Sequence, residues 1–288
     1  MARRQHHEAS RRTADSRPPD AMKVDQPSAA GEYDPAMQTL LQLLWGDGFL
    51  SPGGAAEVAY LLEGSNIAGC SVLDIGCGLG AVDELLVVRH GARSVLGVDV
   101  DPGLLDTMAR RIERAGLAAQ ISTLCVEPGP LPLDAGSFDV VFSKDAIVQI
   151  PDKGAVFADA FRVLRPGGCL IVSDWLRGGS GPYSPEMLEF FRLEGITYNM
   201  ANMTETRDTL ARAGFVEIEV RDRNDWYREQ ARRELAALAG AMRPLVTERI
   251  GAARAAHFIA NWQQMVRVLE RGELRPGHLK ACKPAAPR

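Results

Sequence analysis

The sequence lacks a long apolar run, and no stretch approaches the roughly 20 residues that a membrane-spanning helix needs. It also lacks a basic excess, since 33 Lys and Arg residues face 37 Asp and Glu residues for a formal net charge of −4. A dedicated nucleic-acid binder usually shows the opposite balance. Its 5 cysteines are scattered, without the CxxC spacing of a metal site, which indicates reduced thiols. These absences predict a cytoplasmic protein with no membrane, nucleic-acid or metal partner.

The chain divides into a short polar tail and one larger domain. Residues 1–30 are rich in Arg, Ser, Pro and Ala, and no apolar periodicity runs through them, so we expect a disordered N-terminal tail. This tail also lacks the apolar core of a signal peptide. Residues 31–288 carry enough apolar sequence for one elaborated domain, which we expect to be monomeric.

Within that domain, short strands rich in Val, Leu and Ile alternate with amphipathic helices. Strands are expected at 71–76, 94–100, 121–126, 138–143, 169–175, 215–223 and 277–283. Helices are expected near 80–90, 103–115, 152–164 and 204–213, with a helical stretch over 225–271 that breaks near Pro244. This alternation predicts an α/β fold, with a mostly parallel seven-stranded sheet covered by helices on both faces. Segments 34–63, 176–203 and 225–271 exceed a minimal sheet, and we expect them to form a helical lid or substrate layer.

The strongest local signal is the glycine-rich run at 72–80, which reads VLDIGCGLG. A buried strand leads into a loop that opens a helix. Gly76 and Gly78 allow a ligand to approach the backbone closely, and the helix N-terminus supplies free N–H donors. The same spacing also fits a dinucleotide site, so the pattern alone leaves a nicotinamide enzyme open.

Two acidic residues favour a nucleoside ligand with a positively charged end. Asp74 lies two residues before the first glycine, where it can orient a cationic amino-acid portion but would repel a pyrophosphate. Asp99 ends the second strand about 20 residues after the loop, placed to accept both ribose hydroxyls. The pair therefore points to S-adenosylmethionine as the cofactor.

Further motifs follow in a fixed order, and together with the glycine loop they resemble the class I S-adenosylmethionine-dependent methyltransferases, which have a Rossmann-like fold. From Tyr33 to Lys283 the chain is similar to the phosphoethanolamine N-methyltransferases. The segments that carry this resemblance are 45–54 (WGDGFLSPGG), 137–141, 143–147, 150–153, 162–168 and 213–215.

The resemblance implies a set of site residues. In that family Asp145 would hold the substrate amine, and Tyr33 would close over the cofactor as part of the catalytic machinery. The positions that would contact the cofactor are Leu50, Ser51, Asp74, Gly76, Cys77, Gly78, Asp99, Val100, Glu127, Pro128 and Ser143.

One departure concerns the base. The family pairs the tyrosine at position 33 with a histidine four residues beyond the aspartate, and this chain has Gln149 there. Glutamine donates and accepts hydrogen bonds but cannot take up a proton at physiological pH. His278, which opens the last expected strand beside a glycine, is a candidate replacement if that strand is antiparallel.

The other departures lie where the family binds phosphate. Tyr198 is retained, but apolar Ile196, Trp175 and Met265 replace an arginine, a tyrosine and a lysine. An unpaired dianion in such surroundings carries a desolvation cost of at least several kcal/mol. Arg192 is a candidate repair, because it lies one turn before position 196 on the expected helix and hence on the same face.

These observations predict a methyltransferase that N-methylates a small amine. The main enzymatic alternative is O- or C-methylation of a less polar natural product. A non-catalytic cofactor-binding protein and a nicotinamide oxidoreductase also stay open.

Overall fold

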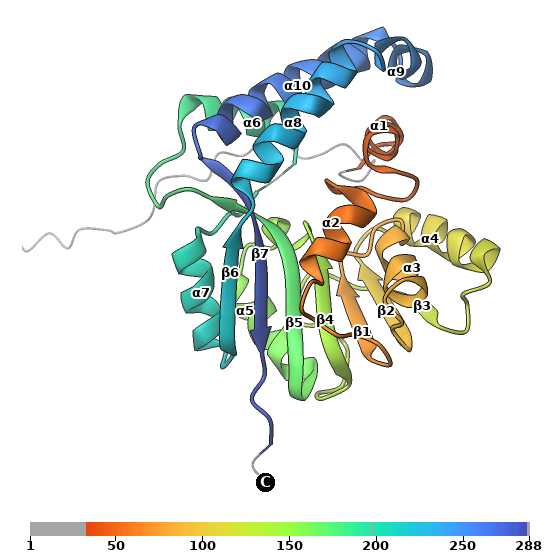
Figure 1. The fold of residues 1–288 in the computed structure, drawn as a ribbon, viewed down its shortest axis with the longest axis vertical. Helices are drawn as coiled ribbons and strands as arrows, with labels where there is room; N and C mark the ends of the chain where they lie inside the picture. Colours follow the sequence, from red (N-terminus) through yellow and green to blue (C-terminus); the bar gives the residue numbers. More distant parts are fainter. Residues whose placement is uncertain (1–32, 197, 287–288) are drawn as a thin grey trace, which may run out of the picture.

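The computed structural model describes residues 33–196 and 198–286. The tail predicted over 1–30 lies outside the described residues. Within them, one seven-stranded sheet runs through the molecule in the order β3-β2-β1-β4-β5-β7-β6 (Figure 1). Its strands are β1 (Ser71–Ile75), β2 (Ser94–Asp99), β3 (Ile121–Cys125), β4 (Phe138–Lys144), β5 (Leu164–Arg177), β6 (Val216–Asp222) and β7 (Leu274–Cys282).

The sheet is mostly parallel, as the alternation of strands and helices predicts. Strands β3, β2, β1, β4 and β5 pair in parallel, while β7 runs antiparallel between β5 and β6. An antiparallel last strand places its first residues at the edge where the parallel strands end.

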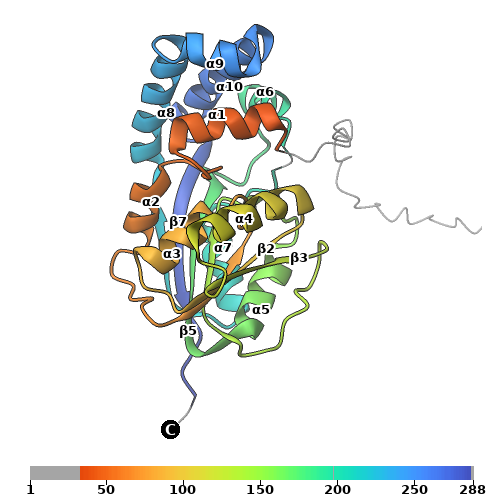
Figure 2. The ribbon, with the colours of Figure 1, turned by 90° about the vertical axis from the view of Figure 1, so that its right-hand side faces the viewer.

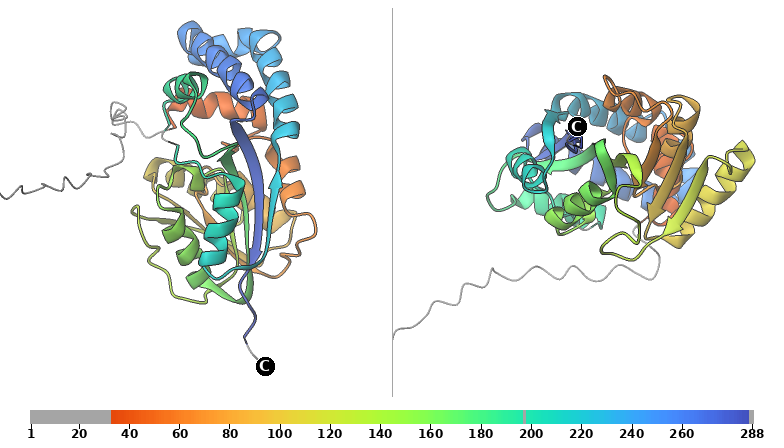
Figure 3. Two further views of the ribbon diagram at one scale, coloured as in Figure 1. Left: turned by 90° about the vertical axis from the view of Figure 1, so that its left-hand side faces the viewer. Right: turned by 90° about the horizontal axis from the view of Figure 1, so that it is seen from below.

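Helices cover both faces of the sheet, and their apolar sides form two core clusters with it (Figure 3). One face is covered by α2 (Gly54–Leu61), α3 (Ala81–Val88) and α4 (Pro102–Ala115), and the other by α5 (Lys153–Val163) and α7 (Met203–Arg212). Buried strand residues alternate between the clusters, because successive side chains of a strand point to opposite faces. Val140 and Phe142 belong to the first cluster, and Val141 belongs to the second.

A separate helical layer lies beyond the carboxyl ends of the parallel strands (Figures 1 and 2). Its helices are α1 (Pro35–Trp45), α6 (Pro185–Glu194), α8 (Asn224–Ala239), α9 (Arg243–Ile250) and α10 (Ala252–Glu270). They share a third apolar core of their own. These helices fall in the segments expected to form a lid or substrate layer. None of the described helices is long and apolar enough to cross a membrane.

The structure differs from the expected elements at three places. The expected helical stretch over 225–271 breaks at residues 240–242, close to Pro244 as expected, and a second time at Gly251. Pro244 lies in the first turn of α9, where its missing N–H costs no hydrogen bond. Strands β5 and β7 begin earlier than expected, because a register shift between β4 and β5 accommodates residues 166–168 and because β7 pairs with the extended end of β5.

Candidate active site

The glycine loop lies at the carboxyl edge of the sheet, between β1 and α3. Gly76 adopts a φ of +79°, and a Cβ added there would lie 2.2 Å from the Cβ of Ala146. Gly78 also has a positive φ, and its N–H donates to Oδ2 of Asp99 at 3.0 Å. The N–H of Asp101 donates to Oδ1 of the same carboxylate at 3.0 Å. The structure thus joins the loop and the end of β2, as the sequence predicts, and only glycine suits the first position.

Asp74 is buried beneath this loop, and its Oδ1 has no hydrogen-bond partner among the described residues. An unsatisfied buried acceptor beside a side-chain-free cradle fits a ligand that brings hydrogen-bond donors. Val100 follows β2 and is largely exposed at this edge, and the exposed Glu127 and Pro128 follow β3. Their predicted cofactor contacts therefore have an open approach.

Cys77 and Ser143 have buried side chains that support the glycine loop from the side of the core. Cys77 belongs to the core under α3 and α4, and the Ser143 hydroxyl donates to the carbonyl of Ile75 at 2.7 Å. Leu50 lies above the loop, where a Cβ added to Gly78 would be 3.4 Å from its Cδ1. The neighbouring Ser51 is buried. Because Leu50 also lines the adjacent pocket, it joins the cofactor site to the acceptor site.

A second carboxyl beside Asp74 was not anticipated from the sequence. Asp83 is fully buried in the first turn of α3, and its carboxyl shares a side-chain hydrogen bond with that of Asp74. Burial is the main cause of the raised pKa of Asp74 and of Asp83, and the charge of Asp74 adds to the rise at Asp83. Acids in the first turn of a helix are ordinarily exposed and favourable to the helix dipole, so no sequence pattern indicates this buried pair.

The Asp74–Asp83 pair makes stability depend on pH. A carboxyl whose pKa is higher in the folded protein destabilises it as pH rises from the unfolded pKa, about 3.9, towards the folded value. Asp83→Asn should therefore raise the free energy of unfolding relative to the parent protein more at pH 8 than at pH 4.5. The gain is about 1.4 kcal/mol for each unit by which the pKa was raised. Urea unfolding at both pH values measures it, and a difference that stays constant with pH would contradict it.

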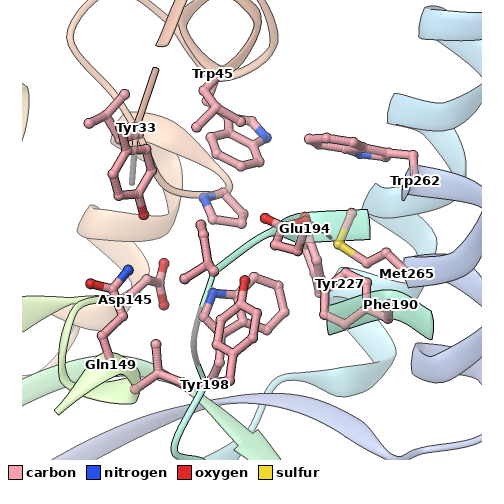
Figure 4. A pocket seen from close by; sticks show the side chains of 16 residues that line it. Tyr33, Trp45, Asp145, Gln149, Phe190, Glu194, Tyr198, Tyr227, Trp262 and Met265 are labelled. Atoms are coloured by element: carbon pink, nitrogen blue, oxygen red, sulfur yellow. Dashed lines mark hydrogen bonds between the residues drawn. The ribbon is translucent and has the colours of Figure 1, made fainter. Parts of the chain in front are cut away.

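The acceptor pocket lies between the sheet edge and the helical layer (Figure 4). About 510 Å³ there is free of protein atoms, and this volume includes open solvent at the mouth. Predicted residues Tyr33, Leu50, Asp145, Gln149, Trp175, Tyr198 and Met265 all line it. The further lining residues are Leu41, Trp45, Pro52, Val148, Phe190, Glu194, Ile196, Tyr227 and Trp262. The lining is therefore aromatic and apolar, with two carboxylates and no Lys, Arg or His.

Asp145 follows β4 with a left-handed backbone, at a φ of 60°. Its N–H donates to the carbonyl of Ser173 at 2.7 Å, and its Oδ1 accepts from the Ser173 hydroxyl at 3.1 Å. Its Oδ2 accepts from the Nζ of Lys144 at 3.0 Å, and that ammonium also donates to the carbonyl of Pro52 at 2.9 Å. A non-glycine residue in this conformation persists only when its surroundings enforce it, and such residues cluster at functional sites.

Arg192 is not brought to the pocket. It forms an ion pair with Glu189 on the outer side of α6, where its side chain is 67% exposed. The prediction that it replaces the lost arginine is wrong in this respect. Helix α6 ends at Glu194, with Gly195 in the left-handed conformation, so position 196 no longer shares a helical face with residue 192. Instead, Glu194 reaches the pocket.

Glu234 lies behind the pocket wall and fixes two of its indole rings. Trp45 donates from Nε1 to Oε1 of Glu234 at 2.7 Å, and Trp262 donates from Nε1 to Oε2 at 3.0 Å. The hydroxyl of Tyr227 lies 3.4 Å from Oε2. Burial raises the pKa of Glu234, while these hydrogen bonds act to lower it. The carboxylate thus orients aromatic faces around the pocket.

His278 lies behind Asp145 rather than in the pocket. It is buried, and its Nε2 is 2.8 Å from Oε1 of Glu57. Arg223 also binds Glu57, through Nε at 2.8 Å and Nη2 at 2.7 Å. Burial would raise the pKa of Glu57, but its hydrogen bonds and charge interactions with His278 and Arg223 outweigh burial and lower it. His278 lines a neighbouring small cavity with Asp145 and is not placed to touch an acceptor in the main pocket.

No group of three or more His, Cys, Asp or Glu side chains among the described residues could hold a metal ion.

Comparisons with known proteins show what the chain is similar to in sequence and in fold. Residues 72–168 match the family described as a methyltransferase domain. The chain is 31% identical to phosphoethanolamine N-methyltransferase 1 of Arabidopsis thaliana over 194 residues, which are 67% of this chain and 38% of that enzyme. It therefore spans well under half of this relative.

Other similar proteins include a C-methyltransferase and an N-methyltransferase of known structure. Sterol 24-C-methyltransferase of Aspergillus fumigatus is 30% identical over 172 residues, 55% of this chain and 45% of that enzyme. The structure of Haemonchus contortus phosphoethanolamine N-methyltransferase 2, with phosphomonomethylethanolamine and S-adenosylhomocysteine, matches with a TM-score of 0.80 at 22% identity. That match covers 88% of this chain and 59% of the other. The predicted class I methyltransferase fold is confirmed.

Proposed function

We propose that this chain, which carries a class I S-adenosylmethionine-dependent methyltransferase domain, methylates the nitrogen of a small amine that bears no phosphate. The observation that carries this proposal is the pocket lining, in which aromatic rings surround Asp145 and Glu194 without a Lys, Arg or His. Aromatic faces and carboxylates stabilise a cation, and methyl transfer to a neutral amine forms an ammonium cation.

The residues at the sheet edge fit S-adenosylmethionine. The glycine loop and the unsatisfied Asp74 would hold its amino-acid portion, and Asp99 would accept from its ribose hydroxyls. When bound, this cofactor supplies an electrophilic methyl group on a sulfonium. Leu50 lies beside Gly78 of the loop and also lines the pocket, so it would border both the cofactor and the acceptor.

The contribution of the chain to the reaction is positioning. Lys144 and Ser173 hold the two oxygens of Asp145, which can accept an N–H of the acceptor and so aim the nitrogen lone pair at the methyl carbon. A neutral amine needs no base during the transfer itself, so Gln149 in place of a histidine is compatible with N-methylation. Surrounding aromatic rings stabilise the positive charge that develops on nitrogen.

The same pocket disfavours a phosphomonoester. Ile196 and Met265 present apolar atoms, and Glu194 presents a carboxylate. The nearest basic groups behind Asp145 are already paired, Lys144 with Asp145 and Arg223 with Glu57. A phosphate dianion would therefore lose its hydration without gaining a counter-charge.

A paired acceptor comparison tests the proposal. Formation of S-adenosylhomocysteine is measured with phosphoethanolamine and with phosphate-free amines of similar size. The expected kcat/KM for the best amine is at least about tenfold that for phosphoethanolamine, equivalent to about 1.4 kcal/mol. Preferred turnover of phosphoethanolamine would contradict the proposal, and no turnover with any acceptor would favour the non-catalytic alternative.

A less polar acceptor methylated on carbon or oxygen is the second candidate. The apolar share of the lining and the likeness to a sterol C-methyltransferase favour it. Including apolar alcohols and alkenes in the same comparison distinguishes the two candidates.

A further inference from the structure

The acceptor pocket has a second carboxylate that binding of one amine leaves unused. Asp145 and Gln149 lie on one side of the pocket, and Glu194 lies on the other, towards Tyr227 and Met265 (Figure 4). Glu194 is the last residue of α6, a helix end whose dipole disfavours negative charge. A carboxylate at this position therefore does not stabilise the helix, whereas a basic residue would.

Glu194 has neutral partners only. Its Oε2 accepts from Nδ2 of Asn261, a fully buried residue of α10, and Tyr198 also hydrogen-bonds to the carboxylate. No Lys, Arg or His of the described residues forms an ion pair with it. Although part of Glu194 remains accessible, protein atoms surround its carboxylate, and this burial raises its pKa against the opposite effect of the two hydrogen bonds.

The other groups around Glu194 are hydrogen-bond acceptors and negatively charged side chains. Oδ1 of Asn261 lacks a hydrogen-bond partner among the described residues. The pKa of the buried Tyr227 is raised first by burial and then by the negative charges of Glu234, Glu194 and Asp145. This end of the pocket is thus negative in potential and walled by aromatic rings, which is the environment that binds an organic cation.

From this geometry we infer that Glu194 is a specificity residue that binds a second positively charged nitrogen, so that the acceptor is a diamine. Asp145 positions the nitrogen that is methylated, and Glu194 holds the other as an ammonium. The inference rests on the proposed function and specifies its substrate class. It also gives a role to the carboxylate of Glu194. This carboxylate lies at the end of the pocket where apolar Ile196 and Met265 replace the basic residues that would bind a phosphate.

Matched acceptors test this inference. A series of linear α,ω-diamines is compared with monoamines of equal chain length, each assayed for kcat and KM with the intact protein. At the best length the diamine should show a KM at least about tenfold lower than its monoamine, as one charge-assisted hydrogen bond would give. Glu194→Gln should abolish most of this difference in KM between the diamine and the monoamine.

Glu189→Gln is the control, since Glu189 lies on the same helix but pairs with Arg192 on the outer surface. It should retain the preference for diamines. If the parent protein methylates monoamines and diamines with equal KM, the inference is wrong while the proposed function stands. If it methylates no amine at all, the proposed function itself fails.

A binding measurement covers the case in which Glu194→Gln does not fold. Calorimetry on the parent protein with S-adenosylhomocysteine compares bis-trimethylammonium alkanes with mono-trimethylammonium alkanes of the same length. The expected result is at least about tenfold tighter binding of the dication at its best length. Equal affinities across the whole series would overturn the inference without any reference to turnover.

Discussion

Asp145→Asn should lower kcat/KM for the amine acceptor roughly 10- to 100-fold while leaving the affinity for S-adenosylhomocysteine unchanged. Asparagine is nearly isosteric and tolerates the left-handed backbone that Asp145 adopts, so the loop should keep its shape. The loss comes from replacing a charge-assisted hydrogen bond, worth about 1.5–3 kcal/mol, at the atom that aims the nucleophile. Steady-state kinetics and calorimetry measure the two quantities.

Asp152→Asn provides the comparison for this prediction. Asp152 is an exposed residue that caps α5 through the N–H of Ala155, a role that asparagine also fills. It should change neither kinetics nor cofactor binding. Unchanged kcat/KM in Asp145→Asn would mean that Asp145 does not contact the acceptor.

Glu57→Gln should destabilise the protein by about 3 kcal/mol at pH 7. Glu57 accepts two hydrogen bonds from Arg223 and lies beside His278, and all three side chains are largely buried between α2 and β7. Removing the carboxylate charge leaves the Arg223 guanidinium buried without a counter-charge, and breaking a buried pair costs about 3–5 kcal/mol. We expect the lower end because glutamine keeps a hydrogen-bond acceptor. Urea unfolding gives the free energy.

The pH dependence of this effect has a definite sign. The pKa of Glu57 is lowered in the folded protein, so its contribution is fully present above the unfolded pKa, about 4.3. It is lost as the pH falls through the lower folded value. The difference between parent and Glu57→Gln should therefore shrink on acidification below pH 4.3. Glu63→Gln, an exposed change just after α2, should be neutral, and an equal loss in both variants would refute the role of the buried pair.

The cofactor half of the site could be predicted because its information is local. The strand, the glycine loop and the helix are consecutive in sequence, and the Asp99 carboxylate joins the loop through the N–H of Gly78, 21 residues away. Parallel strands end at the same edge, so residues after β1 and β2 must meet there.

The acceptor half could be predicted only in part. The hydrogen bond from Trp45 to Glu234 joins residues 189 positions apart, and no periodicity within α1 or α8 indicates that they meet. The error at Arg192 has a smaller cause, since a helix assumed to continue through residue 196 in fact ends at Glu194. Because the end of this helix was placed wrongly, a cation was expected where the pocket has the carboxylate of Glu194. The predicted charge at that end of the pocket therefore had the wrong sign.

The position of the transferred methyl group tests the central claim most directly. The protein is incubated with S-adenosylmethionine that carries a deuterated methyl group and with the best amine of the acceptor comparison, and the product is analysed by NMR and mass spectrometry. We predict that the label is bound to nitrogen of a phosphate-free amine. A label found on carbon or oxygen, or on the nitrogen of phosphoethanolamine in preference to the free amine, would contradict this account.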